Sequence, residues 1–290
     1  MSSTTTSGST LGVLTRQEIR NYLKHKLFWF GAAITVLYIV LIAVDSDETF
    51  GETTTLYMIA PAAALGVLGL VTMFGLTRRS DRAAEAAGAV AVPERTRTLA
   101  LASAVVVPAS LAFVAFLVAV VFYYVDPPES HTVWPEISDL YVHATQFGGG
   151  VMCAIGGPLL GLLLARYLPK RGVAVVAAVV LVLIKILMQG LFEGGQPYRV
   201  FWFWTYFHGP YSADSDHWTR LPGNPFIWVA YLAVVCVLGV VTAVYHDPES
   251  NRPTLKKLAF GLLVVAIVLG VLSMTVGYPE IIHNPLPGEF

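Results

Sequence analysis

The sequence predicts an all-α polytopic membrane protein with about seven transmembrane helices, an N-terminal amphipathic connecting helix and an outer re-entrant aromatic segment. Of the 290 residues, 56% are hydrophobic and only 13% are charged. Soluble domains average roughly 45–50% apolar and about 25% charged residues. The apolar residues also gather into long runs that short polar segments separate. Composition and arrangement together indicate a chain that crosses a bilayer several times.

Each expected span is a run of about 20 mostly apolar residues, which is the length that crosses the hydrocarbon core as a helix. We expect spans at about 27–44, 55–77, 99–125, 145–165, 172–192, 226–245 and 258–276. These spans form a transmembrane domain over 27–276, between a cytoplasmic leader (1–26) and an outer tail (277–290).

The Lys and Arg residues predict the orientation, because cytoplasmic loops retain cations. Fifteen of the 18 fall in the leader and in the loops after the second, fourth and sixth spans. The other loops hold Arg199 and Arg220 together with most of the acidic residues. We therefore expect a multi-pass protein of the inner (plasma) membrane, with its N-terminus in the cytoplasm and its C-terminus outside.

The leader contains a basic amphipathic helix. In "TRQEIRNYLKHKLFWF", Thr15 and Glu18 have the spacing of a capping box, so the helix is expected to begin there. Apolar residues then recur at helical spacing, and cations occupy the remaining surface. Such a helix lies at the membrane surface before the chain enters the bilayer.

A second basic segment, "TRRSDRAAEAAGAVAVPERTRT", lies between the second and third spans. It has an Ala-rich helical piece, a break at Gly88 and Pro93, and closing cations. With the leader, it resembles the transmembrane subunits of type-2 ABC exporters, whose cytoplasmic stretch has the form Arg-Arg-x-x-Gly-Thr-x-Glu-x-Leu-x-x-x-Pro-x-x-Arg. Here "DRAA" replaces the usual Gly-Thr, and the likeness covers roughly residues 1–125.

The resemblance implies a permease without catalytic residues, driven by a separate ABC ATPase subunit that carries ATP and Mg. It implies a dimer with a second membrane subunit, identical or homologous, and an amphiphilic, lipid-like, peptide or drug-like substrate. The bilayer is the other expected partner, and nucleic acid is not expected. The segment 78–98 would be the coupling loop. The expected ATPase contacts are Glu18, Arg20, Arg78, Arg79, Glu85, Arg95 and Arg97. Contact of these arginines with lipid headgroups is the alternative.

The outer segment 193–225 is rich in aromatic residues, which favours a re-entrant or interfacial position. A lone ammonium inside a span, at Lys185, should face a bundle interior, a partner subunit or water. The expected residues of a substrate path or an intersubunit contact are Lys185, Glu193, Trp202 and Trp204. An aromatic belt that positions the spans is the alternative for the tryptophans.

Gly157 and Gly161 have the small-x-x-x-small spacing that lets two helices approach closely. The histidines form no compact metal motif, and we expect no metal or cofactor on this chain. Gly-Gly-Gln at 194–196 matches part of an ATPase signature by chance, since the chain lacks a P-loop and this segment is expected outside.

Two other functions stay open at this point. One is a membrane scaffold or accessory subunit of a larger complex, which needs no ATPase. The other is a membrane enzyme that acts on lipids. The only feature that favours it is a set of scattered histidines on the expected outer side. The seventh expected span also differs from the typical member of the exporter family, which has six spans. The substrate, the transport direction, and homodimer against heterodimer are not determined by the sequence.

Overall fold

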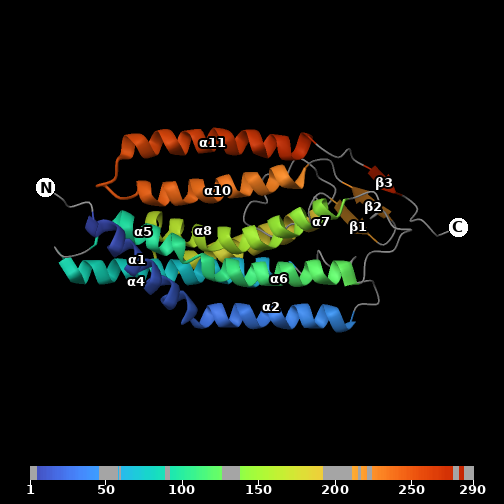
Figure 1. Cartoon of the computed structure of the whole chain (residues 1–290), viewed down its shortest axis with the longest axis horizontal. Helices are drawn as coiled ribbons and strands as arrows, with labels where there is room; N and C mark the ends of the chain where they lie inside the picture. Colours follow the sequence, from blue (N-terminus) through green and yellow to red (C-terminus); the bar gives the residue numbers. More distant parts are fainter. Residues whose placement is uncertain are drawn as a thin grey trace.

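The computed structural model describes residues 5–45, 58, 60–88, 92–125, 138–191, 211–214, 217–220, 224–276 and 281–283. Within these ranges the chain is a bundle of long helices running roughly parallel to one axis (Figure 1). The helices are α1 (Thr5–Leu23), α2 (Lys26–Asp45), α4 (Leu68–Ala87), α5 (Glu94–Ser103), α6 (Val106–Val125), α7 (Asp139–Gln146), α8 (Cys153–Tyr167), α9 (Val173–Leu191), α10 (Pro225–Tyr245) and α11 (Arg252–Thr275).

Every predicted span coincides with one or two of these helices. Five helical segments in the described ranges are long and apolar enough to cross a membrane, and a sixth counts if α1 and α2, bent by 60°, form one broken span. Helix α9 is not among these five segments, because its described apolar part, Val173–Ile184, is shorter than a full span. The chain is therefore a multi-pass helical membrane protein, with five or six crossings by this measure against the seven that the sequence predicts.

A small antiparallel sheet was not predicted. Strands β1 (Tyr211–Asp214), β2 (His217–Arg220) and β3 (Ile281–His283) are paired in the order β1-β2-β3. Thr219 lies opposite Ile282 in the register of β2 and β3. The sheet joins part of the segment expected to be re-entrant to the predicted outer tail.

The helices alternate in direction, so the basic residues gather at one end of the bundle. We call this the basic end: it holds α1 and the turns α4–α5, α8–α9 and α10–α11, all on the left in Figure 1. The break predicted within 78–98 falls where expected, because α4 ends at Ala87, Gly88 takes a φ of 57°, and α5 begins after Pro93. The Ala-rich piece is the last part of α4.

Two stretches of π-helix interrupt the bundle centre. The π-helix η2 (Pro61–Val67) precedes α4, and η5 (Phe147–Met152) lies between α7 and α8. They contact each other, and α8 packs along both η2 and α4. Wide π turns inside helices are rare and occur mostly at functional sites.

Helix α8 approaches both η2 and α4 through glycine, as the sequence predicted for Gly157 and Gly161. A Cβ atom at Gly157 would overlap the backbone carbonyl of Gly66, and one at Gly161 would overlap that of Leu70. The carbonyls belong to backbone, which cannot move aside as a flexible side chain can. The close approach of α8 to η2 therefore requires glycine at position 157, and its close approach to α4 requires glycine at position 161.

Helices α2 and α11 lie at the margins of the bundle and expose long apolar faces. Helix α11 packs mainly on α10. The exposed face of α11 includes Phe260, Ile267, Val268 and Val271, all 50% exposed or more. Such a face is stable in lipid or against another membrane-embedded surface, and would be unfavourable in water.

The glycine contact gives a first prediction. Gly157→Ala should lower the free energy of unfolding by about 1–3 kcal/mol, the usual cost of overpacking a close contact. Gly75→Ala is the matched control, because a Cβ atom at Gly75 meets no atom within 4 Å. Thermal unfolding in detergent, followed by tryptophan fluorescence, measures both; equal melting temperatures for the two variants would refute the glycine contact.

Candidate functional site

Helix α1 lies along the basic end and packs against α5, α4 and the start of α6. Tyr22 on its inner face is 1% exposed, and its ring meets Phe28 edge-on at 5.7 Å. Burial raises the pKa of the Tyr22 hydroxyl well above its usual range. Helix α1 is thus an integral layer of the bundle.

The predicted capping box is wrong. Helix α1 begins at Thr5, so Thr15 and Glu18 lie inside it. The carboxylate of Glu18 turns instead toward α4. Its Oε2 atom accepts from Asn21 Nδ2 on α1 at 3.0 Å and lies 3.4 Å from Arg79 Nη2 on α4. The Glu18 side chain is 10% exposed, whereas that of Arg79 is 50% exposed. A nearly buried carboxylate here has a largely exposed counter-ion.

A pocket of about 390 Å³ opens beside this pair, between α1, α4 and the start of α5. Its polar wall contains Gln17, Glu18, Asn21, Arg79, Ser80 and Arg97, and its apolar wall contains Leu14, Ala83, Ala84, Ala87, Val92 and Ala100. Three of the predicted ATPase contacts, Glu18, Arg79 and Arg97, therefore share one concave surface.

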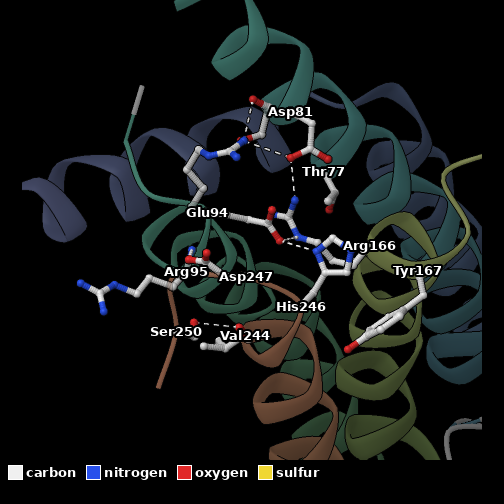
Figure 2. Close-up of polar contacts among 12 residues, drawn as sticks. Thr77, Asp81, Glu94, Arg95, Arg166, Tyr167, Val244, His246, Asp247 and Ser250 are labelled. Carbon is white, nitrogen blue, oxygen red and sulfur yellow. Dashed lines mark hydrogen bonds and ion pairs between the residues drawn. The ribbon is translucent and has the colours of Figure 1, made fainter. Parts of the chain in front are cut away.

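A second polar group at the basic end centres on Arg166, near the end of α8 (Figure 2). The Arg166 side chain is 2% exposed, and its Nη1 atom lies 2.6 Å from Asp81 Oδ1 on α4. Its Nε atom lies 3.7 Å from Glu94 Oε1, at the first residue of α5. Burying a guanidinium costs several kcal/mol unless opposite charges surround it, and two carboxylates do so here.

Arg97 joins α5 directly to α4. Its Nη1 atom donates to Asp81 Oδ1 and to the Ser80 carbonyl, each at 3.0 Å, and its Nε donates to the Val92 carbonyl at 3.2 Å. The side chain is 14% exposed. Two arginines thus face Asp81 and Glu94, and their formal charges balance.

The end of α10 completes the group. His246 Nδ1 lies 2.6 Å from Glu94 Oε1, and the ring of Tyr167 lies 5.2 Å from that of His246. Asp247, buried at 3% exposure, accepts from the backbone N–H of Arg95 at 2.9 Å. That N–H is in the first turn of α5, where amides lack helical acceptors and a carboxylate is favourable. We call Asp81, Glu94, Arg97, Arg166 and His246 the basic-end cluster; it joins α4, α5, α8 and α10.

The turn between α1 and α2 adjoins the same region. His25 Nδ1 lies 3.5 Å from Thr72 Oγ1 on α4, and burial together with the positive charge of Arg79 lowers the His25 pKa. A lowered pKa favours the neutral imidazole. The resulting contribution to stability is complete above the usual pKa of about 6.5 and is lost as pH falls through the lowered value.

The remaining predicted contacts lie on the outer surface of the basic end. Arg20, Glu85 and Arg95 are exposed and Arg78 is partly exposed. In Figure 2 the Arg95 side chain points away from the basic-end cluster while its backbone binds Asp247. The predicted set therefore divides into a pocket group, Glu18, Arg79 and Arg97, and an exposed group.

The predicted substrate-path residues are not brought together in the described part of the chain. Lys185 belongs to α9, but its side chain lies outside the description. Glu193, Trp202 and Trp204 lie in a segment outside the described residues. Their proposed role stays a prediction.

A separate polar network lies at the opposite end, between α6 and α7. Tyr123 donates to Asp139 Oδ1 at 2.9 Å, and His143 lies 3.2 Å from both the Tyr124 hydroxyl and the Gln146 side-chain oxygen. Ser138 caps α7 by accepting from Tyr141 N. No group of three or more potential metal ligands occurs among the described residues.

Sequence reasoning missed Asp81, Glu94, Arg166, His246 and Asp247. Arg166 looks like an ordinary cation at the cytoplasmic end of a span, and Asp81 like one acid among arginines. One signal was available in the sequence. Pro93 followed by Glu94 marks the start of a helix, and the first backbone N–H groups of a helix need acceptors such as a carboxylate from elsewhere in the chain.

The comparisons add no relative: no family of known proteins, no curated protein and no solved structure matches the chain. Function must therefore be inferred from the geometry and from the sequence resemblance.

The basic-end cluster gives a second prediction. Arg166→Gln removes the buried counter-ion that Asp81 and Glu94 share and should cost about 3–5 kcal/mol of stability. Arg171→Gln, at an exposed cation five residues further on, is the control and should change stability by less than about 0.5 kcal/mol. Urea or thermal unfolding in detergent gives both values. If Arg166→Gln behaves like the control, the cluster does not hold the helices together.

Proposed function

We propose that the chain is the transmembrane subunit of an ABC-type exporter. A separate ATPase subunit would bind the basic end and drive the movement of an amphiphilic, lipid-like, peptide or drug-like substrate. The supporting observation is the packing of α1 onto α4 and α5, which joins the two segments that resemble the exporter family into one surface.

This surface suits a soluble partner. Its exposed residues include both signs of charge: Arg20 on α1, Glu85 on α4 and Arg95 on α5. They project from helices whose opposite faces are packed, so their positions are fixed before a partner arrives. Complementary charges on a preorganised surface favour rapid and specific association. By the distribution of cations, this end faces the cytoplasm, where ATP is present.

The basic-end cluster offers a route from that surface into the bundle. A force on the α4–α5 turn would reach α8 through Asp81 and Arg166, and α10 through Glu94 and His246. Along α8 it would then reach η2 and η5, where glycines permit close sliding contacts. Rigid elements that meet at a bistable centre can convert such a force into alternating access.

The partner carries ATP and Mg in this proposal, and this chain contributes binding and movement. A second membrane subunit, identical or homologous, would pair with one of the exposed apolar faces. The plasma membrane is the proposed location, with the N-terminus inside and the C-terminus outside.

Co-purification tests the proposal and is the third prediction. The tagged chain, solubilised from its native cells at low salt, should retain an ABC ATPase in stoichiometric amounts. Glu85→Arg and Arg95→Glu should each reduce the recovered ATPase about tenfold, as expected for reversal of an interfacial charge worth about 1.4 kcal/mol. Mass spectrometry of the eluate measures the ratio.

Lys257→Glu is the matched control, since Lys257 is also exposed at the basic end but belongs to α11. It should leave the ATPase ratio unchanged. Equal loss in all three variants would indicate a nonspecific effect of charge, and recovery of other membrane subunits without any ATPase would contradict the exporter.

The second candidate is a membrane scaffold or accessory subunit. The long apolar face of α11 favours it, because that helix packs mainly on α10 and offers a large surface to another membrane protein. A scaffold would co-purify with membrane subunits alone and would tolerate charge reversal at Glu85 and Arg95.

A further inference from the structure

We propose that the pocket between α1, α4 and α5 binds the headgroup of a lipid that carries a primary ammonium and a phosphate, such as phosphatidylethanolamine. The ammonium would pair with Glu18 and the phosphate with Arg79. This proposal does not depend on the ATPase, because it requires only that the bundle lies in a bilayer.

The carboxylate of Glu18 is the first reason. Its Oε2 atom binds Asn21 and Arg79, whereas its Oε1 atom has no hydrogen-bond partner among the described residues. The residue is only 8% exposed and lines the pocket. A carboxylate that lines a pocket and has an oxygen without a protein donor can accept a hydrogen bond from an ammonium, which has three N–H donors.

The neighbouring guanidinium is the second reason. Arg79 lies 3.4 Å from Glu18, is half exposed and makes no other side-chain hydrogen bond within the described structure. Its guanidinium can therefore donate N–H groups to a phosphate without leaving a buried partner unsatisfied. A carboxylate and a guanidinium side by side match a ligand whose positive and negative groups are also adjacent.

The depth of the pocket is the third reason. The apolar part of α4 ends at Leu76, and the pocket residues of α4 run from Arg79 to Ala87. The rise from Arg79 to Ala87 is about 12 Å, so this wall begins next to the hydrocarbon and passes through the headgroup layer. The cations Arg16, Arg20 and Lys24 on α1 are also exposed, and they would attract anionic lipid headgroups in the same layer.

The apolar wall supplies the room. Ala83, Ala84, Ala87 and Ala100 present only methyl groups, which leaves about 390 Å³ open beside Glu18. A flat salt bridge on a surface would offer no such volume. The small side chains suit the glycerol and methylene groups that follow the phosphate of a lipid.

The experiment is native mass spectrometry of the purified full chain, equilibrated in micelles with equal amounts of phosphatidylethanolamine and phosphatidylcholine of the same acyl chains. Phosphatidylcholine has the same phosphate, but its quaternary ammonium has no N–H to donate. The wild-type chain should retain phosphatidylethanolamine at least tenfold in preference. Glu18→Gln should reduce this preference to about one, while Glu249→Gln, at an exposed carboxylate in the turn between α10 and α11, should preserve it.

Arg79→Gln separates the two halves of the site. It should weaken the retention of phosphatidylethanolamine and of phosphatidylcholine alike. The preference for phosphatidylethanolamine should fall less than it does in Glu18→Gln. Circular dichroism and gel filtration identify any variant that has not folded. If Glu18→Gln does not fold, Asn21→Ala replaces it: this change removes the hydrogen bond that orients the Glu18 carboxylate, and it should lower the preference severalfold.

Three results would overturn the proposal. In the first, wild type and Glu18→Gln retain the two lipids in the same ratio. In the second, soluble phosphoethanolamine displaces the lipid at equal concentration, which assigns the pocket to a soluble zwitterion. In the third, the wild type shows no lipid preference but Glu18→Gln loses the co-purified ATPase, which assigns the pocket to a basic side chain of that partner.

Discussion

The buried charge of Arg166 is the constraint on which the basic end depends. A guanidinium that is 2% exposed needs carboxylates within reach, and the fold supplies Asp81 from α4 and Glu94 from α5. Glu94 in turn holds His246 at the end of α10. Four helices are thereby fixed in register at one end of the bundle, although buried ion pairs are retained more for specificity of arrangement than for net stability.

The pocket and the exposed charged surface of α1, α4 and α5 both follow from this arrangement. Arg97 binds Asp81 on one side and lines the pocket on the other, so the position of α5 determines the shape of the pocket. The charged surface faces away from the cluster, with Arg95 turned outward. Toward the bundle centre the contacts change from ion pairs to glycine packing between α4 and α8. A rigid, charged end thus adjoins a closely packed but apolar centre.

Much of the fold could be predicted from the sequence, because long apolar runs and the distribution of cations reflect the bilayer directly. The break near Gly88 and the close contact at Gly157 were also readable from local residue types. Arg166 was not, because its pairing with Asp81 joins residues 85 positions apart and leaves no periodic signal. The strand 217–220 was missed for another reason: it pairs with the neighbouring 211–214 as well as with the distant 281–283, but the aromatic residues of this segment indicated an interfacial position. The predicted start of α1 was wrong, because the helix already begins at Thr5 and so includes both residues of the capping pattern.

The central claim is that the surface formed by α1, α4 and α5 binds an ABC ATPase. The most direct measurement replaces Glu85 with a photocrosslinking amino acid in the native cells and identifies the adduct by mass spectrometry. The same replacement at Val268, on the exposed face of α11, provides the reference. The account predicts an ATPase adduct from position 85 and none from position 268. An adduct at position 85 with a different membrane protein, without any ATPase, would contradict it.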